Sequence, residues 1–176
     1  GMVTLAAAAM GLSLRGIVIT GAAARFAASP DWPCGMAADL LAQFAAELAV
    51  DCELTLRRFV ALQSRGAPHA REQIRCLRAE LAARGAPQPD ALAGGLAALR
   101  DDDARQWLDR IQQPVLLIHG ERDLLVPIEA ARATARLLPR ARLVTIAAAG
   151  HATFLSHPDE FLAAVLEYVH ERAANF

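Results

Sequence analysis

The pattern that most constrains this chain lies between residues 114 and 158, where two apolar segments of strand length alternate with polar loops. Residues 114–120 form a continuous apolar run that is typical of a strand buried on both faces. Residues 142–147 form a second run, and a helical pattern that opens at Pro127 separates the two. Strands that alternate with a helix favour a parallel sheet, so this part of the chain predicts an α/β fold.

An aspartate follows the first of these strands and a histidine follows the second. Asp123 lies in the turn after residues 114–120, and His151 comes directly after Gly150. Loops at the carboxyl ends of neighbouring parallel strands converge on one crevice, so we expect the two side chains to meet. Either residue alone would be an ordinary loop residue. Together they predict the base and acid of a nucleophile–base–acid relay, because a histidine can move a proton and a carboxylate can fix its tautomer.

These motifs resemble the C-terminal part of an α/β-hydrolase: Gly-x-x-Asp-x-x-Val-Pro at 120–127, Gly-His at 150–151, Phe154, and Pro-x-x-Phe at 158–161. That family orders its triad Ser, Asp, His along the chain and carries the serine in a G-x-S-x-G turn. The resemblance implies that Asp123 is the acid and His151 the base. The four serines are Ser13, Ser29, Ser64 and Ser156, and none lies in such a motif. We therefore expect the serine nucleophile to be absent from this chain.

The first 20 residues are interpreted on the same resemblance. The family continues Gly-x-Ser-x-Gly-Gly into a helix, and on that alignment the serine would precede Gly1. Gly1 is either this glycine or a residue left from a cleaved tag in front of Met2. Both can hold if a start codon was assigned inside the gene, and we favour this combined interpretation. Residues 2–14 then predict a helix that ends at Arg15 and Gly16, and residues 16–20 predict a strand.

Residues 34–111 change to helical spacing and are predicted to form a lid over the sheet. A helix is expected over 91–99, and the acidic cluster 101–103 is expected to cap the next helix, which carries Trp107. The expected apolar faces of the earlier lid helices are Leu40, Leu41, Phe44 and Leu48, then Leu56, Phe59, Val60 and Gln63, then Ile74, Leu77 and Leu81. The predicted organisation is a core of residues 1–33 and 112–176, with about three parallel strands and flanking helices, and a helical lid of residues 34–111.

The lid carries a stripe of arginines. Arg71, Arg75 and Arg78 recur at i, i+4 and i+7, which places them on one helix face. From this pattern alone, a solvated helix face is the preferred interpretation.

Several lid segments resemble one branch of the hydrolases, the pimeloyl-acyl-carrier-protein methyl ester esterases of biotin synthesis. The segments are Trp32-Pro33, Arg58-Phe59-Val-Ala-Leu-Gln63, Ala70-Arg71-x-x-x-Arg75 and Leu92-x-Gly-Gly-Leu96. The resemblance implies that Arg58, Arg71 and Arg75 hold an acidic carrier protein. It also implies that Phe59 and Leu124 lie on the substrate side of the lid and loop. Leu54 departs from the pattern, since the branch can carry an arginine there.

Composition excludes several classes of function. The net charge of −1 gives no basic field for nucleic acid or an anionic membrane, and no apolar run reaches the length of a membrane span. Cys34, Cys52 and Cys76 lack C-x-x-C spacing, so we expect free thiols in a reducing compartment, the cytoplasm. We expect no metal ion and no cofactor.

The resemblance therefore implies an esterase acting on a carrier-protein-linked ester. We expect the chain to be inactive alone because the nucleophile is missing. A non-catalytic module that binds a carrier protein or acyl chain, and a hydrolase of small free esters, remain alternatives. Residues 17–19 are expected to form an open apolar edge, which predicts a homodimer or a larger assembly.

Overall fold

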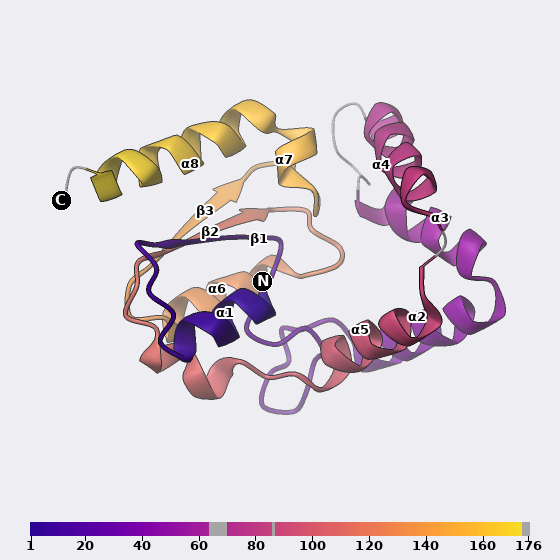
Figure 1. Ribbon diagram of the computed structural model, residues 1–176, viewed down its shortest axis with the longest axis horizontal. Helices are drawn as coiled ribbons and strands as arrows, with labels where there is room; N and C mark the ends of the chain where they lie inside the picture. The colour runs from indigo at the N-terminus through magenta and orange to yellow at the C-terminus, as the bar shows by residue number, and fades with distance from the viewer. Residues whose placement is uncertain (64–69, 86, 174–176) are drawn as a thin grey trace.

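The computed structural model describes residues 1–63, 70–85 and 87–173 of the chain. Within them lies one sheet of three parallel strands in the order β1 (Ile17–Thr20), β2 (Val115–Gly120) and β3 (Ala141–Ile146). Val115 pairs with Ile17 on one side and with Ala141 on the other. The predicted parallel sheet is confirmed, and the carboxyl ends of its strands point toward the lid helices (Figure 1).

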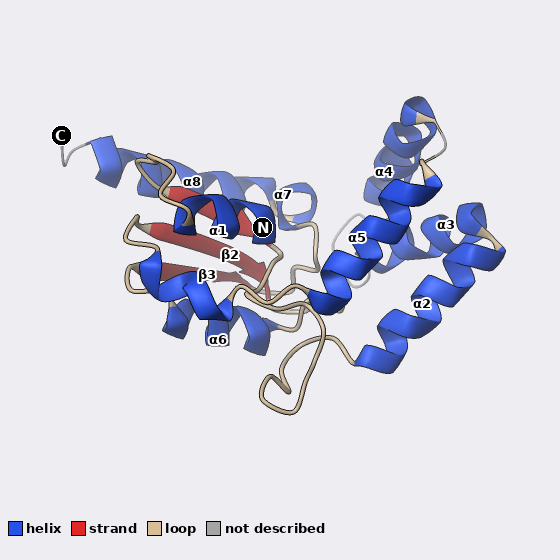
Figure 2. Cartoon of the chain, turned by 60° about the horizontal axis from the view of Figure 1, so that its bottom comes forward, coloured by secondary structure: helices blue, strands red, loops and turns tan. Residues whose placement is uncertain are grey.

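Helices cover both faces of the sheet (Figures 1 and 2). Helices α1 (Met2–Ala9) and α6 (Ile128–Leu137) lie on one face, and α8 (Pro158–Ala173) lies on the other. Alternate residues of β2 serve the two faces: Val115 and Leu117 pack with α1 and α6, whereas Leu116 and Ile118 pack with α8. A strand covered in this way needs apolar side chains at every position, which is why residues 115–118 show no alternation.

Helix α1 ends earlier than the sequence predicted. It stops at Ala9, and Gly11 takes the left-handed conformation with φ +87°. The N–H of Gly11 donates to the carbonyl of Ala8, and the N–H of Leu12 donates to that of Ala7. These are the two bonds of a Schellman motif, so Gly11, and not Gly16, is the glycine that terminates the helix.

The lid consists of helices α2 (Ala38–Val50), α3 (Cys52–Gln63), α4 (Ala70–Arg84) and α5 (Pro89–Asp101), which lie beyond one end of the sheet (Figure 2). The predicted face of α2 is correct for Leu41 and Leu48, which are buried, and wrong for Leu40, which is 57% exposed. Helix α5 begins at Pro89 and is longer than the predicted 91–99. Proline is tolerated in the first turn of a helix, because the N–H that it lacks would have no partner within the helix.

The two chain segments that join the lid to the core lie side by side. The N–H of Ala104 donates to the carbonyl of Ala24 at 2.8 Å, and Arg25 pairs with Asp103 at 3.3 Å. Arg105 bonds Asp103 at 2.6 Å and Asp31 at 2.8 Å. We call Arg25, Asp31, Asp103 and Arg105 the stem cluster.

The acidic run 101–103 caps the next helix through Asp103 alone. Asp101 ends α5, whereas Oδ1 of Asp103 accepts the N–H of Arg105, the first residue of the short 3₁₀ helix η1 (Arg105–Arg110) that carries Trp107. Asp103 also bonds the side chains of Arg105 and Arg25.

The C-terminal helix is anchored to the sheet by a tyrosine. A short helix α7 (Thr153–Ser156) precedes α8, and the Ser156 hydroxyl lies 2.9 Å from His157 Nδ1. Tyr168 of α8 is buried: its hydroxyl donates to the carbonyl of Pro114 and accepts the N–H of Ile17. This anchor turns Ala164 and Tyr168 inward, whereas Val169 is 48% exposed.

None of the helices in the described ranges combines the length and apolarity that crossing a membrane would need.

Candidate active site

The turn after β2 holds the Asp123 carboxylate by its own backbone. Oδ1 of Asp123 accepts the N–H groups of Leu125 at 2.8 Å and Val126 at 3.0 Å. The Asp123 side chain is fully buried. Two backbone donors compensate for the loss of water around a buried carboxylate and leave its other oxygen free for a second partner.

That second partner is His151, from the loop after β3. Nδ1 of His151 lies 2.8 Å from Oδ2 of Asp123, so the predicted contact is present. An ionised carboxylate only accepts, so Nδ1 carries the proton and Nε2 is left as the acceptor. The His151 side chain remains 26% exposed, which leaves the imidazole accessible beside a buried acid. This arrangement can take a proton at Nε2 and stabilise the resulting imidazolium.

His119, the fifth residue of β2, also belongs to the surroundings of Asp123. Its Nε2 lies 2.7 Å from the carbonyl of Val126 and 3.3 Å from Oδ2 of Asp123. Burial lowers the pKa of His119, because the charged ring would be cut off from water. Neutral His119 therefore donates its Nε2–H to Val126, which stiffens the acid turn. His119 was not among the predicted site residues; its place four residues before Asp123 was the available signal.

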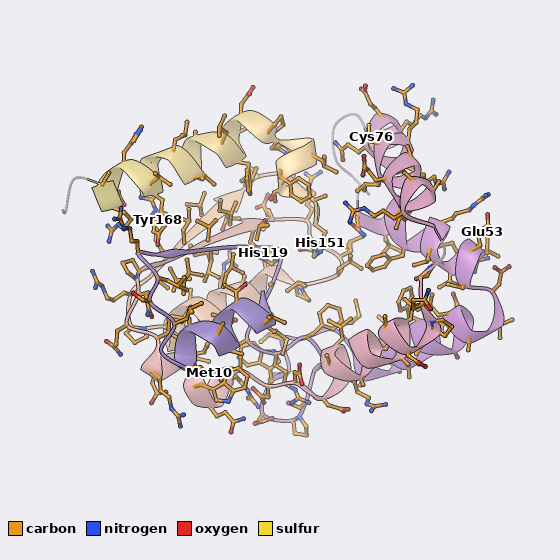
Figure 3. All side chains as sticks on the ribbon, in the orientation of Figure 1. Met10, Glu53, Cys76, His119, His151 and Tyr168 are labelled. Carbon is orange, nitrogen blue, oxygen red and sulfur yellow. The ribbon has the colours of Figure 1, made fainter. Side chains whose placement is uncertain are left out.

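Both histidines lie at the side of the sheet that faces the lid (Figure 3). A cavity of about 950 Å³ opens there between core and lid, and His151 lines it. Its walls are mainly apolar and come from α2 and the residues before it, from α3 and α5, and from the acid turn: Met36, Leu40, Leu41, Phe44, Leu48, Leu56, Phe59, Leu62, Leu92, Leu96, Leu99, Leu124, Leu125 and Val126. A cavity of this size and lining suits a mostly apolar ligand of drug-like size.

The structure separates the residues predicted for binding into two groups. Arg58, Phe59 and Leu124 line the cavity, and Arg58 pairs with Glu47 at 3.7 Å. Arg71 and Arg75 are exposed on α4 and are not among the lining residues. Arg75 pairs with Glu72 at 3.6 Å, while Arg71 forms no ion pair with the part of the chain that the structure describes. All three arginines are exposed, but only Arg71 and Arg75 share one helix.

A nucleophile is not found beside His151 in the described ranges. Ser29 bonds Asp31 and Ser156 bonds His157, whereas Ser13 lies exposed before β1. Ser64 lies outside the described residues. The same ranges hold no group of three or more histidine, cysteine or acidic side chains that could bind a metal ion.

Comparison with known proteins agrees with this geometry. Residues 1–158 match the alpha/beta hydrolase fold family, and the chain belongs to that family. Within it, the chain is 43% identical over 169 residues to the pimeloyl-[acyl-carrier protein] methyl ester esterase of Xanthomonas oryzae pv. oryzae, covering 96% of this chain and 67% of the relative. It is 44% identical over the same length to the enzyme of that name from Stenotrophomonas maltophilia, covering 65% of it. The chain thus spans about two thirds of the length of these relatives.

Solved structures show the same fold at lower identity. An esterase from Exiguobacterium antarcticum superposes with a TM-score of 0.82 at 22% identity, over 96% of this chain and 63% of that one. A bromoperoxidase from Bacillus anthracis gives 0.72 at 24% identity, over 88% and 58%. These likenesses establish the architecture.

Proposed function

We propose that this chain carries the base and acid of a carboxylic ester hydrolase whose substrate is the methyl ester of a dicarboxylic acyl chain on a carrier protein. The observation that supports the proposal most directly is the 2.8 Å contact between His151 Nδ1 and the buried Asp123, at the wall of an apolar cavity. The names of the relatives supply the substrate class.

The proposed reaction is acyl transfer through serine. Nε2 of His151 accepts the proton of a seryl hydroxyl while its oxygen attacks the ester carbonyl, and Asp123 stabilises the imidazolium. His151 returns the proton to the departing methoxide, so methanol leaves and an acyl-enzyme remains. Water, deprotonated by the same nitrogen, then attacks the acyl carbonyl. The bond to the seryl oxygen breaks, His151 returns the proton to that oxygen, and the acid leaves. We assign the nucleophile to no residue of this chain, because the sequence has no G-x-S-x-G motif.

The proposed substrate side is the lid. The apolar walls contributed by α2, α3 and α5 fit an acyl chain, and Phe59 and Leu124 belong to them. Arg58 at the cavity and Arg71 and Arg75 on α4 are the proposed contacts for the acidic carrier, because guanidinium groups favour carboxylate partners. This proposal retains the division into a core of 1–33 and 112–176 and a lid of 34–111.

The test uses two proteins: the chain alone, and a fusion that places the G-x-S-x-G segment of a related α/β-hydrolase before Gly1. Methanol release from pimeloyl-carrier-protein methyl ester is measured for both. We expect turnover by the fusion only, with a higher kcat/KM than for the free methyl ester. Equal kcat/KM values would favour a hydrolase of small esters. Carrier binding without turnover by the fusion would favour the binding module.

We also propose that the chain self-associates through β1 and acts in the cytoplasm. In the described part of the chain β1 pairs only with β2, and Val18 is 39% exposed. Ile17 and Ile19 were expected to be exposed at this edge, but they are buried beneath α1. The three cysteines form no disulfide, which fits a reducing compartment. Light scattering that gives a monomer mass at high concentration would contradict the self-association.

A further inference from the structure

The histidine loop rests on the carboxyl end of β1 at Gly21. Gly21 follows Thr20 directly, and its N–H continues the strand ladder by donating to the carbonyl of Ile118 at 3.2 Å. Its φ is +57°, in the left-handed region. A Cβ at this position would lie 2.9 Å from Cε1 and 3.1 Å from Nδ1 of His151. The imidazole therefore lies against Gly21 so closely that a side chain at this position would collide with it.

The backbone of the same loop rests on the neighbouring strand. A Cβ on Gly120, the last residue of β2, would overlap the carbonyl oxygens of Gly150 and Ala149. The ends of two adjacent strands are thus both without side chains where the loop crosses them. The backbone of 149–150 lies on Gly120, and the His151 ring lies on Gly21.

A hydroxyl pair ties the loop to β1 beside this contact. Oγ1 of Thr20 lies 3.0 Å from Oγ1 of Thr153, and the N–H of Thr153 donates to the carbonyl of His151. Thr153 is fully buried and Thr20 is half-buried, so the pair is partly shielded from water. Thr20 and Gly21 therefore contact the histidine loop through a hydrogen bond and through direct packing.

We infer that Gly21 is a positioning residue: it seats the His151 ring so that Nδ1 meets Asp123, and the Thr20–Thr153 hydroxyl pair holds the loop on that seat. A side chain at position 21 would push the ring away from Oδ2 of Asp123, and the 2.8 Å contact would be lost. This inference rests on the proposed function for its consequence in catalysis, but the geometry that it describes can be tested without catalysis.

The test compares Gly21→Ala with Gly11→Ala. Gly11 has φ +87° and nothing within 4 Å of its Cβ position, so this control has the backbone strain without the collision. The readout is the low-field Nδ1–H proton resonance of His151 in the NMR spectrum of the chain, assigned by its disappearance in His151→Ala. We expect Gly21→Ala to lose this resonance and Gly11→Ala to retain it. A resonance equally strong in both variants would overturn the inference.

A second variant covers the case in which Gly21→Ala does not fold. Thr20→Val keeps the shape of the side chain and removes the hydroxyl, and Thr4→Val on the exposed face of α1 is its control. We expect faster exchange of the His151 Nδ1–H with water in Thr20→Val than in Thr4→Val. Equal exchange rates would contradict the role of the hydroxyl pair. If Gly21→Ala does not fold, they would also contradict the positioning role of Gly21.

In the serine-bearing fusion, Gly21→Ala should lower kcat roughly 100-fold with KM little changed, since a displacement of about 1 Å costs that much. If the fusion does not hydrolyse esters but Gly21→Ala still loses the resonance, the proposed function is wrong and the positioning role of Gly21 is supported. If the fusion is active and Gly21→Ala retains both kcat and the resonance, the positioning role of Gly21 is wrong and the proposed function is supported.

Discussion

All six residues of strand β2 are buried, whereas in the 15-residue helix α4 only Gln73 is buried, and α5 buries none. The acid turn follows β2, whereas Arg71 and Arg75, two of the proposed carrier contacts, lie on α4. Dense packing fixes groups that must meet within a hydrogen bond. A sparsely packed lid can open for a chain-like ligand, because few buried contacts resist its movement.

The largest effect is expected when a residue of the proposed relay is replaced in the densely packed core. In the serine-bearing fusion, His151→Ala and Asp123→Asn should each lower kcat by roughly 10⁴-fold, because the base is lost in one and its tautomer in the other. Ester turnover measured at saturating substrate checks this. His157→Ala, a half-buried histidine six residues along, is the control and should retain activity. A relay variant with kcat close to that of the control would remove the catalytic assignment.

The two regions should also differ in their response to a lost leucine. Leu117 of β2 is 2% exposed and Leu81 of α4 is 41% exposed. Leu117→Ala should lower the free energy of unfolding by about 2–5 kcal/mol, because a cavity is left in the core. Leu81→Ala should change it by about 0.5 kcal/mol or less. Urea denaturation of both variants provides the comparison; similar losses would mean that the lid is as tightly packed as the sheet.

The lid should instead respond to charge. Reversing Arg71 and Arg75 to Glu should weaken carrier binding by up to roughly 30-fold and lessen its salt dependence, since each of the two exposed pairs is worth at most about 1 kcal/mol. Reversing Arg57 and Arg84, both exposed lid arginines, makes the same change in net charge. Titration calorimetry with the carrier protein separates the two. Equal carrier affinities for the two double variants would mean that the arginines of α4 form a solvated helix face with no role in carrier binding.

The smallest effect is expected where the two regions join. The hydrogen bond from Arg105 holds the pKa of Asp103 below its ordinary value, and the Arg25 side chain adds to this. A carboxyl group with a depressed folded-state pKa stabilises the fold above its unfolded pKa of about 4 and loses that contribution as the pH falls through the folded value. Asp103→Asn should therefore be less stable than the parent at pH 7, with the difference shrinking toward pH 3. Thermal unfolding at both pH values tests this; a constant difference would show that the charge of Asp103 is not responsible.

The strands, most helices and the contact between Asp123 and His151 could be predicted because each depends on local pattern. A continuous apolar run needs two covered faces, and parallel strands bring the loops at their carboxyl ends together wherever the rest of the chain lies. The end of α1 was missed because Gly11 and Gly16 are both glycines after a helical segment. Only the backbone conformation shows which of them adopts positive φ.

The sequence by itself determined the α/β class, the order of the elements and the residue types that form the acid–histidine pair, since these follow from periodicity and spacing. Tertiary structure decided which neighbours hold that pair. His119 meets Val126 because the acid turn folds back on β2, and Gly21 meets His151 across 130 residues of chain because parallel pairing places β1 beside the histidine loop. Contacts between distant segments depend on how close two backbones approach, and no spacing along one strand or helix records that distance.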